Sequence, residues 1–211
     1  MNKIKFILVG EGAVGKTSII SQFIDQKFEG TYVMTVGRDK LIKELEIEKK
    51  KIILEIWDTP GQEKYNHVNK IFMKNTKIAL IVYSIIDKKS FENLDKWINI
   101  IKEVNKNEEV TFGIAANKSD MFENQVVSKE EGEGYVKDKN ILFFETSAKD
   151  YKSIEKVFIE LTKAYLKKIE EKNPVLDNLN SINSIENNYV NMDNINSKDD
   201  GKGSFHLHHH R

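Results

Sequence analysis

The segment GEGAVGKT, Gly10 to Thr17, most limits what this chain can fold into. It follows an apolar run, Ile4 to Val9, and opens a segment with helical spacing, Lys16 to Asp25. It matches the pattern G-x-x-x-x-G-K-[ST], in which successive backbone N–H groups surround phosphate oxygens at a helix N-terminus. The pattern therefore predicts a strand, a phosphate-binding loop and a helix, in that order. The alternative is a glycine-rich turn that only links the strand to the helix.

Apolar runs and helical segments alternate along the rest of the chain. The runs typical of strands buried on both faces are Ile4 to Val9, Ile52 to Trp57, Ile78 to Ser84, Thr111 to Ala116 and Ile141 to Phe144. Helical spacing covers Lys16 to Asp25, Ser90 to Val104, Ser128 to Lys137 and Ser153 to Ile169. Leu41 to Glu48 alternates apolar and charged residues, which predicts an antiparallel edge strand in a hairpin. We therefore expect a three-layer α/β fold: a mostly parallel six-stranded sheet with one antiparallel edge strand and helices on both faces.

The composition changes near the C-terminus. From Asn173 onward the chain is rich in Asn, Ser and Asp and has no sustained hydrophobic period. We expect one domain over residues 1–172 and a disordered tail over residues 173–211. The histidines between His206 and Arg211 are interpreted as a cloning remnant or plain disorder rather than a metal site.

Charge and cysteine content exclude several classes of function. The 33 basic and 33 acidic residues give zero formal net charge, so no overall field favours nucleic acid or an acidic membrane. The absence of cysteine excludes disulfides, thiolate metal sites and lipid attachment to sulfur. The longest apolar stretch, Ile78 to Ile86, is too short to span a bilayer, and no signal peptide is recognised. A soluble, cytoplasmic protein is expected.

The first motif predicts a site for phosphates and a metal ion. Lys16 would supply a point charge to the β- and γ-phosphates, and the Thr17 hydroxyl would ligate Mg²⁺. The nucleotide-binding residues predicted in this loop and the helix it opens are Gly12, Ala13, Val14, Gly15, Lys16, Thr17 and Ser18.

The second motif, WDTPGQEKY from Trp57 to Tyr65, lies at the end of a predicted buried strand. Asp58 could hold Mg²⁺ through water, the Gly61 N–H could meet the γ-phosphate, and Gln62 could orient an attacking water. The predicted catalytic residues are therefore Gln62, Lys16 and Gly61.

The third and fourth motifs follow two further predicted strands and point to guanine. In NKSD, Asn117 to Asp120, the Asp120 carboxylate can accept hydrogen bonds from N1–H and the exocyclic amine of guanine, a donor pair that adenine lacks. In ETSAK, Glu145 to Lys149, the Ala148 N–H can meet the guanine oxygen. The predicted base-binding residues are Asn117, Lys118, Asp120, Ser147, Ala148 and Lys149. Four motifs in this order, each at the carboxyl end of a strand, predict one nucleotide site.

With these motifs, residues 3 to about 171 resemble a small GTPase of the Ras superfamily, nearest to its Rab branch. The resemblance implies a P-loop GTPase fold and a monomeric switch that binds GTP or GDP with Mg²⁺ and slowly hydrolyses GTP. It also implies a role in vesicle trafficking, with an exchange factor, a GTPase-activating protein and effectors bound through two switch regions. Phe28 would pack against the guanine, and Thr35 would be a switch I ligand of Mg²⁺, alongside Thr17 and Asp58. A peripheral position on endomembranes would also follow.

The sequence departs from the Rab pattern in several places. Val36 to Lys40 puts a lysine where effectors usually contact an aromatic residue. Phe72 to Thr76, FMKNT, stands where Rab proteins usually have a tyrosine pair with Arg-Gly-Ala. Pro60 stands where the family usually has alanine, which favours a stiffer switch II. Without cysteine, any membrane association of this sequence must do without prenylation on sulfur.

Two other functions fit parts of the sequence. One is a module that binds GTP or GDP with little or no hydrolysis, an alternative left open by Pro60 and the altered switch I. The other is an ATP-dependent kinase or ATPase that shares only the P-loop, against which NKSD and ETSAK argue. Arg38 could act as a catalytic finger, but effector contact or simple exposure is the more ordinary interpretation.

Overall fold

The structure is a computed structural model, and it describes residues 3–25, 33–35, 40–59 and 70–173. The chain divides into two units, Met1–Leu166 and Lys167–Arg211. The architecture below is that of the first unit. The tail predicted for residues 173–211 lies outside the described residues except for Asn173.

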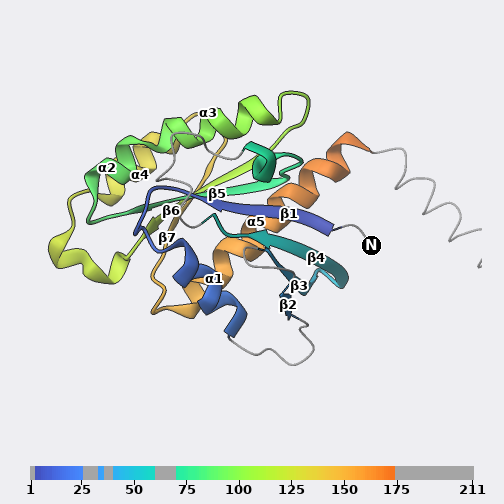
Figure 1. Ribbon diagram of the computed structural model, residues 1–211, viewed down its shortest axis with the longest axis horizontal. Helices are drawn as coiled ribbons and strands as arrows, with labels where there is room; N and C mark the ends of the chain where they lie inside the picture. Colours follow the sequence, from blue (N-terminus) through green and yellow to red (C-terminus); the bar gives the residue numbers. More distant parts are fainter. Residues whose placement is uncertain (1–2, 26–32, 36–39, 60–69, 174–211) are drawn as a thin grey trace, which may run out of the picture. The chain divides into compact units, whose positions relative to one another are not determined.

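A mixed sheet forms the centre of the first unit (Figure 1). Its strands are β1 Lys3–Val9, β2 Val33–Thr35, β3 Lys40–Ile47, β4 Lys50–Trp57, β5 Ile78–Ser84, β6 Thr111–Asn117 and β7 Leu142–Glu145. They are arranged in the order β2-β3-β4-β1-β5-β6-β7, and β3 runs in the direction opposite to the other six described strands. The six predicted strands and their directions are confirmed. A seventh strand, β2, pairs outside β3, and its three residues are too few to show a period in the sequence.

Helices cover both faces of the sheet. They are α1 Lys16–Asp25, α2 Lys88–Glu92, α3 Leu94–Val104, α4 Lys129–Val136 and α5 Tyr151–Lys172, with 3₁₀ turns η2 Lys70–Met73 and η3 Ser119–Asn124. The predicted helix from Ser90 to Val104 is divided at Asn93, whose ψ of 8° departs from helical geometry. The predicted capping box at the start of α4 is confirmed, because Ser128 and Glu131 each bond the other's backbone N–H.

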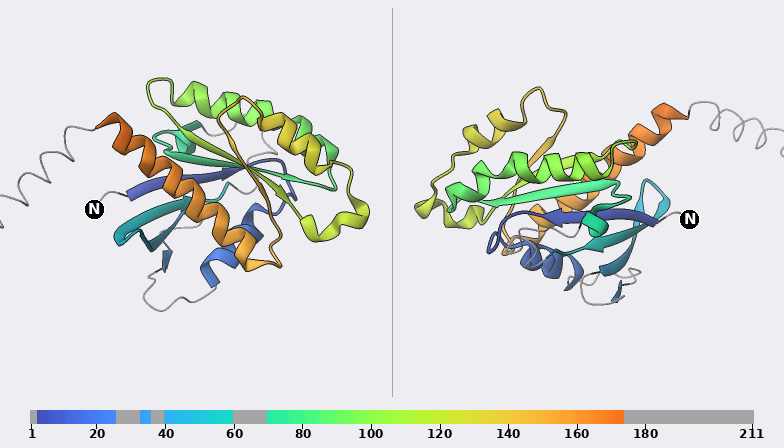
Figure 2. Two further views of the ribbon diagram at one scale, coloured as in Figure 1. Left: turned by 180° about the vertical axis from the view of Figure 1, so that it is seen from behind. Right: turned by 45° about the horizontal axis from the view of Figure 1, so that its top comes forward.

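Two hydrophobic clusters lie on opposite faces of the sheet. Side chains of α1 and α5, such as Phe23 and Phe158, pack on one face, while Leu94, Trp97 and Ile101 of α3 pack on the other. In the view from behind in Figure 2, α5 crosses the sheet on the face away from α3. β5 is buried at every position because both faces are covered, and this explains its continuous apolar run. Among the described residues, no helix has both the length and the apolar composition needed to cross a bilayer.

Candidate functional site

Four loops lie together at one edge of the sheet. They follow β1, β4, β6 and β7, which run parallel, so the carboxyl ends of these strands share that edge. In open α/β sheets this edge is where ligands bind. The first predicted nucleotide-binding motif begins directly after β1, and the other three begin at the last residues of β4, β6 and β7 and continue into these loops.

The loop after β1 needs glycine at two positions. Gly10 has φ of +151°, and a Cβ there would lie 2.3 Å from the Val82 carbonyl oxygen. Gly15 has φ of +100°, and a Cβ there would lie 2.4 Å from Asn117 Nδ2. Both distances are shorter than any tolerable contact. The glycines therefore let the loop curl tightly against β5 and β6.

Lys16 begins α1 and turns back toward this loop. Its side chain is buried, and its Nζ donates hydrogen bonds of 2.9 Å to the carbonyl oxygens of Gly10 and Glu11. A buried ammonium must have such partners. These bonds hold the charge against the loop, close to where an anion bound by the loop N–H groups would lie.

The end of β4 lies beside the start of α1. The Thr17 hydroxyl donates a 2.7 Å hydrogen bond to Asp58 Oδ2, so the structure brings these two predicted metal ligands together. The Thr59 hydroxyl donates to the Leu8 carbonyl at 2.9 Å and ties the end of β4 to β1. Sequence reasoning missed this role of Thr59, because its partner is far away along the chain.

These oxygens fit Mg²⁺. The ion prefers hydroxyl and carboxylate oxygens, often one or two carboxylates completed by phosphates and water. Within the described part of the chain, no group of three or more acidic or histidine side chains gathers to bind a metal without a phosphate. The third predicted ligand, Thr35, is the last residue of β2 and is paired with Leu41.

Asn117 joins three of the loops on the other side of the site. Its side chain is 1% exposed. Its Nδ2 donates to the Val14 carbonyl at 2.7 Å, and its Oδ1 accepts from the Thr146 hydroxyl at 2.9 Å. The next residue, Lys118, adopts a left-handed φ of 63° and donates to the Ala13 carbonyl at 2.7 Å. The sequence analysis did not assign this role to Thr146, although the residue lies within ETSAK. The only indication in the sequence is its hydroxyl group, at the position between the end of β7 and Ser147.

Asp120 lies where NKSD and ETSAK meet. Its Oδ1 accepts a 2.8 Å hydrogen bond from the Ser147 hydroxyl, and its Oδ2 lies 3.4 Å from Lys149 Nζ. The Ser147 bond, assisted by Lys149, lowers the pKa of the Asp120 carboxyl from its usual value. The group is therefore an ionised acceptor at neutral pH, as binding the two donors of guanine requires.

The structure thus brings two groups of predicted residues to one edge. The first group is Gly12, Ala13, Val14, Gly15, Lys16, Thr17, Ser18 and Asp58, and the second is Asn117, Lys118, Asp120, Ser147, Ala148 and Lys149. The two groups are joined by the bonds from Asn117 to Val14 and from Lys118 to Ala13. Phe28, Arg38, Pro60, Gly61 and Gln62 lie outside the described residues.

Lys40 takes part in a surface cluster at the start of β3. It lies 3.3 Å from Glu55 and 5.4 Å from the centre of the Trp57 ring. Trp57 Nε1 donates to Glu55 at 2.7 Å, and its ring meets Phe72 edge-on with centroids 5.6 Å apart. Trp57 is therefore half-buried, and its ring is held by contacts with Lys40, Glu55 and Phe72.

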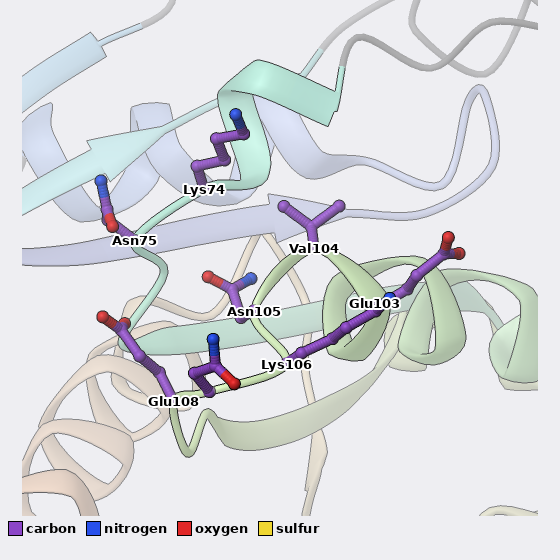
Figure 3. Close-up of a pocket in the computed structure, with 8 residues that line it drawn as sticks. Lys74, Asn75, Glu103, Val104, Asn105, Lys106 and Glu108 are labelled. Carbon is purple, nitrogen blue, oxygen red and sulfur yellow. The ribbon is translucent and has the colours of Figure 1, made fainter.

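A pocket of about 380 Å³ lies away from this edge (Figure 3). Its lining residues come from the segments that lead into β5 and β6, at the amino ends of those strands. Its buried amide, Asn105, already bonds the carbonyls of Met73 and Ile101 and the N–H of Thr76. These bonds fasten the end of α3 to the segment before β5, which is a structural role.

Comparison with known proteins agrees with this site. A family profile described as the Ras family matches residues 5–167. The chain is 40% identical over 175 residues to the Ras-related protein Rab-10 of Diplobatis ommata, covering 83% of this chain and 87% of that protein. It is 40% identical to Rab-10 of Caenorhabditis elegans over 79% of this chain and 83% of that one, and 38% identical to Rab-13 of Bos taurus over 78% and 80%. The chain therefore belongs to the Ras family and is a small GTPase of the Rab type.

Proposed function

We propose that this protein binds GTP and GDP with Mg²⁺, hydrolyses GTP slowly and acts as a nucleotide-dependent switch in vesicle trafficking. The observation that carries the proposal is that Asn117 and Lys118 bond to Val14 and Ala13 of the loop that leads into Lys16 and Thr17. The loop with the Asp120 motif is thereby joined to the loop whose Thr17 bonds Asp58. The side with Thr17 suits phosphates and a metal ion, and the side with Asp120 suits guanine.

The predicted site residues would bind and orient the nucleotide. The loop N–H groups and the Lys16 ammonium hold the phosphates, with Gly12 to Gly15 allowing close approach. Thr17 and Asp58 would hold Mg²⁺, with Thr35 as a third ligand. When bound, Mg²⁺ neutralises charge on the phosphates. Asp120 accepts from guanine, Ala148 N–H donates to it, and Phe28 covers its ring.

Hydrolysis would rest on positioning rather than on covalent chemistry. Gln62 orients the water, while Gly61 N–H and Lys16 stabilise the γ-phosphate. Fast turnover would need an arginine from a GTPase-activating protein. Exchange factors and effectors would bind the two switch regions. On the sequence as given, which has no cysteine, any membrane association would do without prenylation on sulfur.

Single-turnover hydrolysis tests the proposal. The purified protein is loaded with GTP, Mg²⁺ is added, and GDP is measured over time beside Gln62→Leu. Slow conversion that the substitution abolishes supports the proposed switch. Retained, unhydrolysed GTP in both proteins favours a binding module without hydrolysis. Competition with excess ATP tests which base the site prefers. An ATPase would exchange its bound GTP for ATP, whereas a site specific for guanine should keep GTP bound.

A further inference from the structure

Lys43 is a lysine in the hydrophobic interior. Along β3, alternate residues face the cluster under α1 and α5, and Lys43 shares that face with Leu41, Leu45 and Ile47. Its side chain has no exposed surface. A charged group at such a position is costly unless it is bound, and the proposed GTP chemistry does not use it.

The partner of Lys43 is the end of α1. Nζ donates a 2.5 Å hydrogen bond to the Phe23 carbonyl oxygen and lies 3.5 Å from the centre of the Phe23 ring. That ring stacks on Phe158 of α5, with centroids 3.9 Å apart. The last carbonyls of a helix lack partners within it and carry partial negative charge, and α1 has no basic residue in its last turn. Lys43 supplies that missing cation from β3.

The backbone of Lys43 belongs to a second contact. It is paired with Val33 of β2, the strand whose last residue is Thr35. One residue therefore connects β2 with a helix that begins at Lys16 and Thr17. Every link of this path lies within the described residues.

We propose that Lys43 is a positioning residue for the nucleotide site: it holds the strand ending in Thr35 against the helix that carries Thr17, and so slows nucleotide release. The inference rests on the proposed function, because Thr17 and Thr35 are ligands only if Mg²⁺ and a nucleotide bind. Lys43 touches neither of them itself. It acts through α1 and β2.

Protonation of Lys43 offers a signature of this role. Burial lowers the pKa of Lys43 to about 8, while the charge of Glu155 on α5 acts in the opposite direction. The ring and carbonyl of Phe23 on α1, and Leu54 opposite Lys43 on β4, carry no titratable group. A neutral amine binds a helix carbonyl more weakly than an ammonium does. Release should therefore become faster as the pH rises through about 8.

The test measures release of a fluorescent GDP analogue from the whole 211-residue chain in excess GDP. Lys43→Met keeps the length of the side chain and removes the charge; we expect release about tenfold faster, from the loss of one charge-assisted bond. The matched control is Lys51→Met on β4, whose exposed ion pair with Glu44 spans 3.7 Å, and we expect no change there. Release from the wild type should accelerate between about pH 7 and 9, and release from Lys43→Met should not.

The free energy of unfolding distinguishes a positioning role of Lys43 from a general loss of stability in the variant. Replacing a buried charge by an apolar residue often leaves stability unchanged or raised, so urea unfolding of Lys43→Met should show no loss. Equal release rates in Lys43→Met and the wild type would overturn the inference. Faster release with reduced stability and an unchanged pH profile would also overturn it. If the wild type did not retain GDP at all, the proposed function itself would fail; retention with equal rates contradicts only the role of Lys43.

Discussion

The base side and the phosphate side of the site are built differently. On the base side, Asn117, Asp120 and Ser147 already bond to neighbouring loops in ways that leave an acceptor for guanine. On the phosphate side, the Lys16 ammonium bonds to loop carbonyls, and the Thr17 hydroxyl bonds to Asp58. The ammonium is the group that the phosphates would need, and the hydroxyl and the carboxylate are the groups that Mg²⁺ would need. The base side holds its acceptor for guanine through bonds between loops, whereas the phosphate-side groups that would meet the nucleotide and Mg²⁺ bond to the loop and to each other.

This difference matches a switch. The base is the same in GTP and GDP, so its site gains from rigidity, which lowers the entropy lost on binding. The γ-phosphate distinguishes the two nucleotides, and Asp58 on the phosphate side directly follows β4, the strand that precedes the predicted switch II. The predictions below test whether the two sides behave in these different ways.

The largest effect is expected for Asp120→Asn. The change removes two charge-assisted hydrogen bonds to guanine, each worth about 1.5–3 kcal/mol. It also places the Asn NH₂ group against an N–H donor of guanine. GDP should therefore bind roughly 10²–10⁴-fold more weakly. Xanthosine diphosphate, which offers an acceptor in place of the amine, should bind better than GDP. Isothermal titration with both nucleotides measures this. Unchanged preference for GDP would remove Asp120 from base recognition.

Lys16→Met should have the next largest effect. Loss of one ammonium at the phosphates is worth about 3 kcal/mol, or roughly 150-fold in affinity for GDP. Affinity for guanosine, which has no phosphate, should stay the same because the base side is already formed. Titration with both ligands is the measurement. A parallel loss for guanosine would show that the two sides are not independent.

How far these residues could be found from sequence depends on how local their partners are. Lys16 and Asp120 stand at fixed positions in short motifs, because the loop between a strand and a helix sets their geometry. The bond from Thr146 to Asn117 and the capping of α1 by Lys43 join residues 29 and 20 positions apart, and no sequence spacing predicts them. The six main strands could be predicted because burial on both faces requires long apolar runs, whereas β2 has only three residues. The division of α2 from α3 at Asn93 has no proline or glycine to mark it.

Asn117→Ala should affect stability rather than affinity alone. It leaves the Val14 carbonyl and the Thr146 hydroxyl without their buried partner, which costs about 2 kcal/mol of unfolding free energy in nucleotide-free protein. Urea unfolding of the apo protein measures the loss. The control is Asn107→Ala, an exposed residue that faces the other pocket. An apo protein of unchanged stability would mean that the base side is not organised before binding.

Thr17→Val should show the opposite behaviour. Thr17 is exposed, so the loss of its bond to Asp58 should change apo stability by less than about 0.5 kcal/mol. The factor by which Mg²⁺ slows GDP release should be about tenfold smaller in Thr17→Val than in the wild type, because one metal ligand is missing. GDP release with Mg²⁺ and with EDTA provides the measurement. An equal effect of Mg²⁺ in both proteins would separate Thr17 from the metal.

The smallest effect concerns the charge of Asp120. The Ser147 hydroxyl is the main cause of its lowered pKa, so Ser147→Ala should move that pKa back toward 3.8. The folded pKa lies below the unfolded one, so Asp120 stabilises the fold above pH 3.8, and this contribution disappears as the pH falls through the lowered value. The contribution should be small, because 31% of its side-chain surface is exposed. An NMR titration of the Asp120 carboxyl in the apo protein and in Ser147→Ala measures the shift. If the two pKa values are equal, the Ser147 hydroxyl does not hold the Asp120 carboxylate in the apo protein. The base side would then not be organised before guanine binds.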